Sequence, residues 1–171
     1  MQIDIGFADI VTPRPIKVIY PTILDHPLIH LLGYPRETII AEKFHAMVAL
    51  GEINSRMKDF YDIWILANQF EFDGELLQKA IEQTFEYRET PLPTNIPAAL
   101  TESFSEQKRI QWTNFLHRID QTESMEEFAK VIGVLQKFLL PPTQASAGLH
   151  KFTEIWQKEN GWLRKDEPYL A

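Results

Sequence analysis

Apolar residues recur at every third or fourth position through the centre of the chain, which is the spacing of an amphipathic helix. In the first such segment the repeat includes Ile40 and Phe44, and Gly51 stands where a helix would end. Either Asn54 or Ser55 could cap the next one. The spacing predicts three successive helices, over residues 37–50, from 54 or 55 to 67, and over 74–87.

Alternating apolar and polar residues predict two strands before the first helix. Residues 2–8 alternate isoleucine or phenylalanine with smaller or polar residues, and residues 16–23 form a second strand that Pro21 ends or confines to an edge. A loop or short helix is expected over residues 25–35. Because an isolated two-stranded sheet is rarely stable, we expect helices of this chain, or strands from outside it, to cover the hairpin.

The second half of the chain begins with a proline-rich segment, residues 88–97, which we interpret as a subdomain boundary. Beyond it the spacing predicts helices over residues 98–118, 124–140 and 149–159. The second of these opens with the capping box S-M-E-E, and P-P-T-Q-A-S-A-G after it predicts a loop. The predicted fold class is α+β and mostly helical, with a small β-hairpin. Residues 1–88 would form the first part, and residues 89–171 a helical subdomain.

Composition restricts the class of protein further. With 44% hydrophobic residues and 11 Phe among 171 residues, the chain can form an ordinary core. Its formal net charge of −7 disfavours sequence-independent binding to nucleic acid, which needs a basic face. The absence of Cys excludes disulfides, Cys–zinc sites and thiol catalysis. No apolar run reaches the roughly 18 residues of a membrane helix, and no signal peptide is recognised, so we expect a cytoplasmic protein.

Charged residues gather in the first two predicted helices. In the second, Lys58 and Asp62 are four positions apart and Asp59 and Asp62 three apart, so one side carries a lysine and two carboxylates. Glu42 and Lys43 lie on the flank of the first helix, away from its apolar residues. A lysine suits a phosphate, and paired carboxylates suit Mg²⁺ or a ribose hydroxyl. The same spacing is also typical of a solvated face with an i,i+4 ion pair, so spacing leaves both interpretations open.

Residues 34–64 read Y-P-R-E-T-I-I-A-E-K-F-H-A-M-V-A-L-G-E-I-N-S-R-M-K-D-F-Y-D-I-W. This run resembles the signature of the nucleotidyltransferase-like AbiEii/AbiGii toxin family, the toxin half of abortive-infection (toxin–antitoxin) systems. I-D-I-G-F-A-D at residues 3–9 resembles the second acidic strand of that family. Residues 90–101 and 111–118 resemble its helical C-terminal region. The resemblance covers nearly the whole chain and implies that the hairpin belongs to a polymerase-β-like nucleotidyltransferase sheet.

The resemblance also implies roles for individual residues. Asp4 would be the third acidic residue of the polymerase-β-like site and a metal ligand. Lys43 would contact the phosphates, and it would be catalytic together with Asp4 and Asp62. The nucleotide would be bound by Glu42, Lys43, Lys58 and Asp59. Intact relatives would use Mg²⁺ to transfer a nucleotide from an NTP to RNA or another acceptor, with an antitoxin protein holding them in check.

One part of the family pattern is absent from the sequence. Such enzymes carry Gly-Gly or Gly-Ser followed by an Asp-x-Asp strand, which supplies two metal-binding acids, and this chain contains none of these motifs. Two-metal phosphoryl transfer needs carboxylates that hold both ions. The sequence therefore predicts a toxin-type nucleotidyltransferase that is truncated at its N-terminus and has an incomplete site. Two alternatives stay open. The chain could be a non-catalytic helical interaction module, derived from such an enzyme, that binds a partner protein and whose exposed apolar hairpin leads to oligomerisation or poor solubility. It could also be a longer protein in which Met1 is internal.

Overall fold

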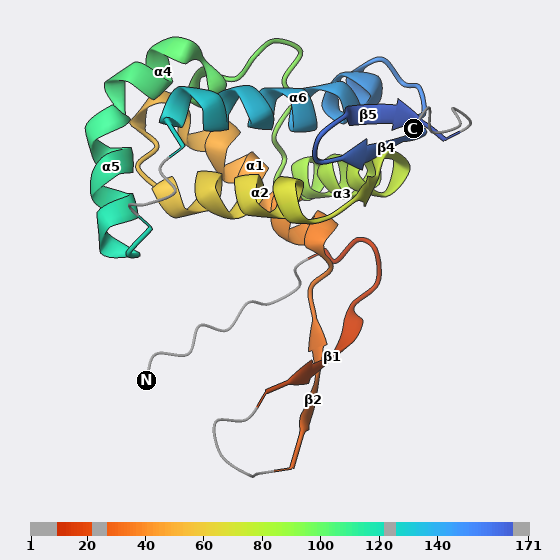
Figure 1. Cartoon of the computed structure of the whole chain (residues 1–171). Coiled ribbons are helices and arrows are strands. Elements are labelled where there is room, and N and C mark those ends of the chain that lie inside the picture. Colours follow the sequence, from red (N-terminus) through yellow and green to blue (C-terminus); the bar gives the residue numbers. More distant parts are fainter. Residues whose placement is uncertain (1–9, 22–26, 122–125, 166–171) are drawn as a thin grey trace.

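The computed structural model describes residues 10–21, 27–121 and 126–165, and shows a helical body from which a β-hairpin extends (Figure 1). The helices are α1 (Arg36–Leu50), α2 (Met57–Gln69), α3 (Gly74–Tyr87), α4 (Glu102–Gln107), α5 (Arg109–Arg118) and α6 (Phe128–Ala147), with 3₁₀ turns η1 (Gly51–Ile53) and η2 (Ala98–Leu100). The strands are β1 (Ile16–Tyr20), β2 (Ile29–Gly33), β3 (Phe72–Asp73), β4 (Glu154–Gln157) and β5 (Gly161–Arg164). The fold is mostly helical α+β, as predicted, with two small antiparallel sheets, β1–β2 and β3–β4–β5.

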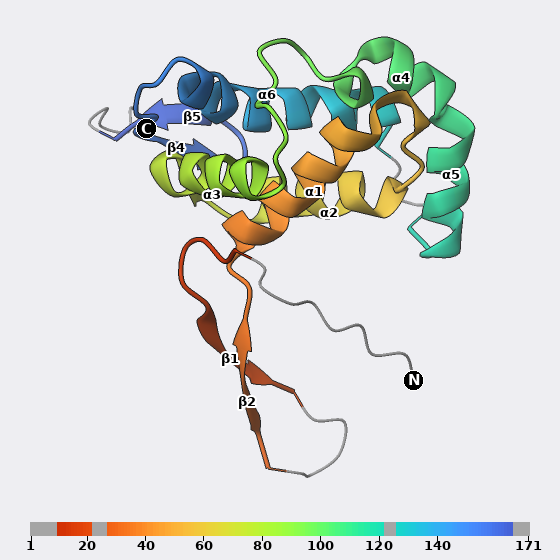
Figure 2. The same ribbon diagram turned by 180° about the vertical axis from the view of Figure 1, so that it is seen from behind.

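The core of the body lies where α1, α2, α3 and α6 meet. α1 packs most closely against α3, and α6 packs against both α2 and α3 (Figure 2). Their fully buried side chains include Phe44, Phe60, Leu77 and Phe138. Burying each contributes about 1.5–3 kcal/mol. The same cluster contains residues from both halves of the chain, and the division at residue 88 stays a prediction.

α1, α2 and α3 confirm the three helices predicted in the centre of the chain, although α2 starts later than predicted. α1 ends at Leu50, and Gly51 follows it with a φ of 52°, in the left-handed region that glycine adopts without strain. The carboxylate of Asp73 caps α3 by accepting hydrogen bonds from two backbone N–H groups of its first turn. α2 begins only at Met57, because the side chain of Asn54 accepts a hydrogen bond of 2.8 Å from the Arg56 N–H and closes a turn before the helix.

The hairpin differs in part from the prediction. β1 confirms the second predicted strand and ends at Tyr20, directly before Pro21. The loop or short helix expected next is wrong, because this segment contains β2, paired antiparallel with β1. Pro27 and Pro35 leave few residues between them for a helix, whereas the apolar residues between them can pair along β1. The strand predicted over residues 2–8 lies outside the described residues.

The loop predicted after residue 140 is wrong, because α6 continues through Pro141 and Pro142. A proline has no N–H for the carbonyl four residues earlier, and such a gap normally interrupts a helix. At Pro142 the indole N–H of Trp162 takes this place and donates to the Phe138 carbonyl at 3.1 Å. A contact distant in sequence thus maintains the helix. Neither α6 nor any other helix of the described part is long and apolar enough to span a membrane.

Three further details of the C-terminal half differ from the prediction. The single helix expected over residues 98–118 is divided into η2, α4 and α5. α6 starts later than expected, and its predicted cap, Ser124, lies outside the described residues. The helix expected over residues 149–159 is instead a loop and the strand β4, which β5 follows. The reason is Trp156, which is buried and donates its indole N–H to the Ala67 carbonyl at 2.7 Å, so that β4 lies beside β3.

Candidate functional site

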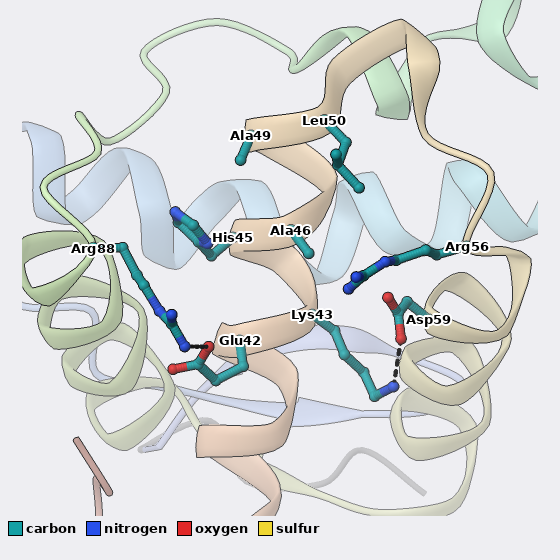
Figure 3. A pocket seen from close by; sticks show the side chains of 9 residues that line it. All are labelled: Glu42, Lys43, His45, Ala46, Ala49, Leu50, Arg56, Asp59 and Arg88. Carbon is teal, nitrogen blue, oxygen red and sulfur yellow. Dashed lines mark hydrogen bonds and ion pairs between the residues drawn. The ribbon is translucent and has the colours of Figure 1, made fainter. Parts of the chain in front are cut away.

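Lys43 of α1 faces the beginning of α2 and brings two of its carboxylates together. Its ammonium nitrogen lies 2.6 Å from Asp59 Oδ1 and 2.8 Å from Asp62 Oδ2, and Figure 3 shows the first of these contacts. The turn η1 between the helices redirects the chain, so that the two helices lie side by side. The Lys43 side chain is only 20% exposed, and the cluster is therefore partly shielded from water.

The cluster changes the proton affinities of its members. Burial alone would lower the pKa of Lys43, but the hydrogen bonds and charges of Asp59 and Asp62 outweigh it, and the pKa is raised above the usual 10.5. Burial alone would raise the pKa of Asp62, but hydrogen bonds from Lys43 and Lys58 outweigh it and lower this pKa. Both groups are therefore charged near neutral pH, and the lysine stays a cation.

Lys58 occupies the solvent side of the same cluster. Its nitrogen lies 2.6 Å from Asp62 Oδ2, and its side chain is 72% exposed. This contact is the i,i+4 ion pair of a solvated helix face that the spacing allowed, and exposed pairs of this kind contribute little to stability. Lys58 therefore adds positive charge to the cluster but little stability.

An open pocket lies on the surface of α1 beside this cluster, and we call it the charged pocket. Its volume is about 390 Å³. Ala46 and Ala49 lie along the middle of it, with Arg56 on the side of α2 and Arg88 on the side of α3 (Figure 3). Small side chains on the floor and cations on both walls make this pocket suitable for an anionic, extended ligand. The lining residues are Glu42, Lys43, His45, Ala46, Ala49, Leu50, Arg56, Asp59 and Arg88.

The α3 wall of the charged pocket is held by contacts distant in sequence. Arg88 pairs with Glu42 at 2.9 Å. His45 Nε2 lies 2.9 Å from Thr90 Oγ1, and its ring packs edge-on against Phe85. Burial, followed by the charge of Arg88, lowers the pKa of His45, so the imidazole is neutral at pH 7.

On the α2 wall Arg56 differs from the other cations of the pocket. Within the described residues its guanidinium makes no hydrogen bond or ion pair, and Figure 3 shows it directed toward α1. A guanidinium offers five N–H donors and suits phosphate groups. Arg56 is therefore the cation with the most donors left for a ligand.

We next compared the chain that forms this pocket with known protein families. Residues 1–134 match the family described as the nucleotidyl transferase AbiEii toxin of type IV toxin–antitoxin systems. The chain belongs to this family. Comparisons with curated proteins and with solved structures gave no match. The resemblance noted from residues 34–64 is thus confirmed, and with it membership of a toxin family of nucleotidyl transferases.

The structure places the residues that the AbiEii resemblance singled out in two groups. Lys43, Lys58, Asp59 and Asp62 form one ionic cluster, and Glu42 lies on the opposite wall of the charged pocket. Asp4 lies outside the described residues. The roles of all six stay predictions.

Sequence reasoning did not single out Arg88 and His45 as parts of the site. Arg88 follows α3, and its partner Glu42 is 46 residues earlier, so no local pattern connects them. His45 is two positions after Lys43, and its partners Phe85 and Thr90 lie on α3 and just after it, so its contacts are not local ones. Arg56 lies three positions before Asp59, but spacing alone does not distinguish a pocket residue from a solvated one at this position.

A divalent metal ion does not fit the described residues. They contain no group of three or more His, Asp or Glu side chains arranged to hold one. The two closest carboxylates, Asp59 and Asp62, both already contact Lys43, so a metal ion would have to displace a cation. No catalytic step of this chain is therefore assigned to Mg²⁺ ligated by these residues.

Proposed function

We propose that this AbiEii-family chain binds the phosphates of an NTP in the charged pocket and thereby serves as the toxin-type nucleotidyltransferase that its family implies. The observation that carries the proposal is the position of Lys43 between Asp59 and Asp62, beside Arg56, whose guanidinium has no partner among the described residues. The acceptor would be RNA or another hydroxyl-bearing molecule, and an antitoxin protein would limit the activity in the cytoplasm.

Each charged residue has a distinct part in this proposal. An ammonium group has three N–H donors, and Lys43 uses two of them on Asp59 and Asp62. Its third donor and the guanidinium of Arg56 would bind phosphate oxygens. Asp59 and Asp62 would position Lys43, and Lys58 would add positive charge from the solvent side.

Metal ligation is a separate part of the proposal. Bound Mg²⁺ would neutralise phosphate charge during nucleotide transfer. Because the described residues do not fit the ion, its ligands would come from outside them, and Asp4 is the one that we propose.

Calorimetric titration with each of the four NTPs, with and without Mg²⁺, tests the proposal. Lys43→Ala and Arg56→Ala should each weaken NTP binding by roughly 10- to 100-fold, because each removes charge-assisted hydrogen bonds worth about 1.5–3 kcal/mol. Ala46→Leu should also weaken binding, since it fills the floor of the pocket and leaves every charge in place. Asp4→Ala should affect only the Mg²⁺-dependent part.

The matched control is Lys130→Ala, which removes an exposed i,i+4 ion pair with Glu126 and lies outside the charged pocket. It should bind NTPs as the unmodified protein does. Unchanged affinity in both Lys43→Ala and Arg56→Ala would refute the proposed role of the pocket.

A second candidate function is a non-catalytic module that associates with a second copy of this chain through the β1–β2 hairpin. One face of the hairpin carries no charged residue, and four of its large side chains are exposed, as at an interaction surface: Ile16, Tyr20, Ile29 and Leu31. The described part of the segment from residue 10 to 34 carries Arg14 and Lys17 but no acidic residue, whereas the whole chain has a net charge of −7. A second copy would offer either the same apolar face or, elsewhere on the chain, acidic residues for Arg14 and Lys17. Sedimentation equilibrium of the purified chain tests this, and a monomer at all concentrations would exclude it.

A further inference from the structure

A second pocket continues from the charged pocket along α1, and we call it the apolar pocket. Its volume is about 230 Å³. Glu42, Lys43 and Arg88 line both pockets, so the two meet at these residues. The apolar pocket is lined by Ile10, Tyr34, Thr38, Ile39, Glu42, Lys43 and Arg88.

The two pockets differ in chemistry. In the apolar pocket the residues not shared with its neighbour are Ile10, Tyr34, Thr38 and Ile39, and none of them is charged. The residues that line only the charged pocket include the charged side chains of Arg56 and Asp59. A ligand that fills both would therefore be anionic at one end and flat or apolar at the other.

Hydrogen bonds hold the outer wall of the apolar pocket in place. The N–H of Thr12 donates to Thr38 Oγ1 at 3.0 Å, and the Thr38 hydroxyl donates to the Thr12 carbonyl at 2.6 Å. The Thr12 hydroxyl donates to Gln83 Oε1 of α3. The segment that contains Ile10 is thereby fastened to both α1 and α3. The wall is formed before any ligand arrives, which lowers the entropic cost of binding.

We infer that the apolar pocket takes the nucleobase of the NTP whose phosphates lie in the charged pocket, and that Tyr34 is the residue on which the base stacks. This inference rests on the proposed function and adds the orientation of the substrate to it. A nucleobase has two apolar faces, and each of the bases can stack on an aromatic side chain. Tyr34 is the aromatic residue that lines the apolar pocket, and it is 51% exposed.

The base of an acceptor RNA terminus is the competing occupant. In that case the affinity for an NTP would depend on its phosphates alone. Inorganic tripolyphosphate, which has the phosphates and no base, distinguishes the two.

Calorimetric titration of the full chain with tripolyphosphate and with each NTP, in the absence of Mg²⁺, tests the inference. An NTP should bind more tightly than tripolyphosphate. Tyr34→Ala should weaken NTP binding by roughly 5- to 150-fold, which corresponds to the loss of one stacked base, and leave tripolyphosphate binding unchanged. Tyr34→Phe is the matched control, because it keeps the ring and should keep most of the NTP affinity. Ile39→Gln, at another residue that lines the apolar pocket, gives an independent second variant with the same expected selectivity.

The outcomes separate the inference from the proposed function. If tripolyphosphate binds but the NTPs bind no more tightly, or if Tyr34→Ala and Ile39→Gln leave NTP affinity unchanged, the base pocket is refuted and the phosphate site stands. If neither tripolyphosphate nor any NTP binds the unmodified protein, the proposed function fails and the inference fails with it.

Discussion

At the scale of single residues, the central feature is a lysine shared by two carboxylates. Lys43 neutralises Asp59 and Asp62, which lie three positions apart on α2 and would otherwise repel each other in a partly shielded place. The second lysine, Lys58, contacts Asp62 from the solvent. The two lysines thus share a partner but differ in burial, which makes them a natural pair for comparison.

We predict that Lys43→Met lowers the free energy of unfolding at pH 7 by about 1–3 kcal/mol, because two partly buried carboxylates lose their shared cation. Lys58→Met should cost less than about 0.5 kcal/mol, as for an exposed pair. The Lys43→Met deficit should shrink at pH 4, where the unpaired carboxylates take up protons. Urea denaturation of the three proteins at both pH values measures this. Equal losses for the two variants would contradict the shielded position of Lys43.

A second residue-scale prediction concerns His45 and pH. Burial and Arg88 lower the pKa of His45 below 6.5 in the folded protein, whereas unfolding restores it to about 6.5. Between these two values the unfolded chain binds one more proton, so stability rises with pH across this window. The contribution is complete above about pH 6.5 and is lost as the pH falls toward the folded-state pKa.

His45→Gln should therefore lose less stability than the unmodified protein when the pH is lowered from 7.5 to 5.5. His117→Gln, at an exposed position, should keep the unmodified profile. Thermal unfolding at closely spaced pH values checks both, and parallel curves for His45→Gln and the unmodified protein would disprove the assignment.

At the scale of elements, α6 depends on a donor from another element. Pro142 leaves the Phe138 carbonyl without its helical partner, and the indole N–H of Trp162 on β5 supplies the missing hydrogen bond. Trp162 also stacks on the ring of Phe138. The β4–β5 strand pair and the C-terminal end of α6 should therefore stabilise each other.

A double-mutant cycle tests this coupling. Trp162→Phe should cost about 1–3 kcal/mol, since it leaves the Phe138 carbonyl without a donor. In a Pro142→Ala background the new backbone N–H can bond that carbonyl, so the same substitution should cost about 1 kcal/mol less. Denaturant unfolding of the four proteins gives the interaction energy. Additive effects would show that Trp162 acts through ring packing alone.

At the scale of the whole molecule, the helical body and the β1–β2 hairpin differ in how far their apolar side chains are buried. The buried cluster of the body, from Ile40 to Trp156, contains no residue of β1 or β2 within the described part. The hairpin instead exposes large apolar side chains, and both views show it extending away from the body (Figures 1 and 2). Two strands alone are marginally stable in water, so the hairpin needs a surface that covers it.

The two faces of the hairpin allow a matched test. Leu31 pairs with Val18 on the apolar face, and its neighbour Leu32 pairs with Lys17 on the other face. Their exposed fractions are 47% and 71%. Under the second candidate function, Leu31→Lys should abolish self-association, Leu32→Lys should retain it, and neither should lower the melting temperature of the body. Sedimentation and calorimetry measure the two properties, and a loss of association in both variants or in neither would refute the face assignment.

The sequence by itself determined the features that depend on neighbours along the chain. The helical spacing around Phe44 and the glycine at residue 51 predicted α1 and its end, and the pattern of residues 74–87 predicted α3. The spacing of Lys58 and Asp62 made their i,i+4 ion pair one of two open interpretations, and the structure shows that ion pair. These features follow from helix geometry and backbone sterics, which act over three or four residues. The motif in residues 34–64 also determined the family.

Only the tertiary structure decided which distant residues meet. Lys43 reaches Asp59 and Asp62 because η1 folds α2 back beside α1, and Arg88 reaches Glu42 across 46 residues because α3 packs against α1. The prolines of α6 predict a break when read locally. The chain stays helical there because the indole of Trp162 satisfies the Phe138 carbonyl. Trp156 likewise makes β4 a strand by bonding the Ala67 carbonyl in the core. A buried polar group must find a partner wherever the fold can offer one, and that requirement overrides local propensity.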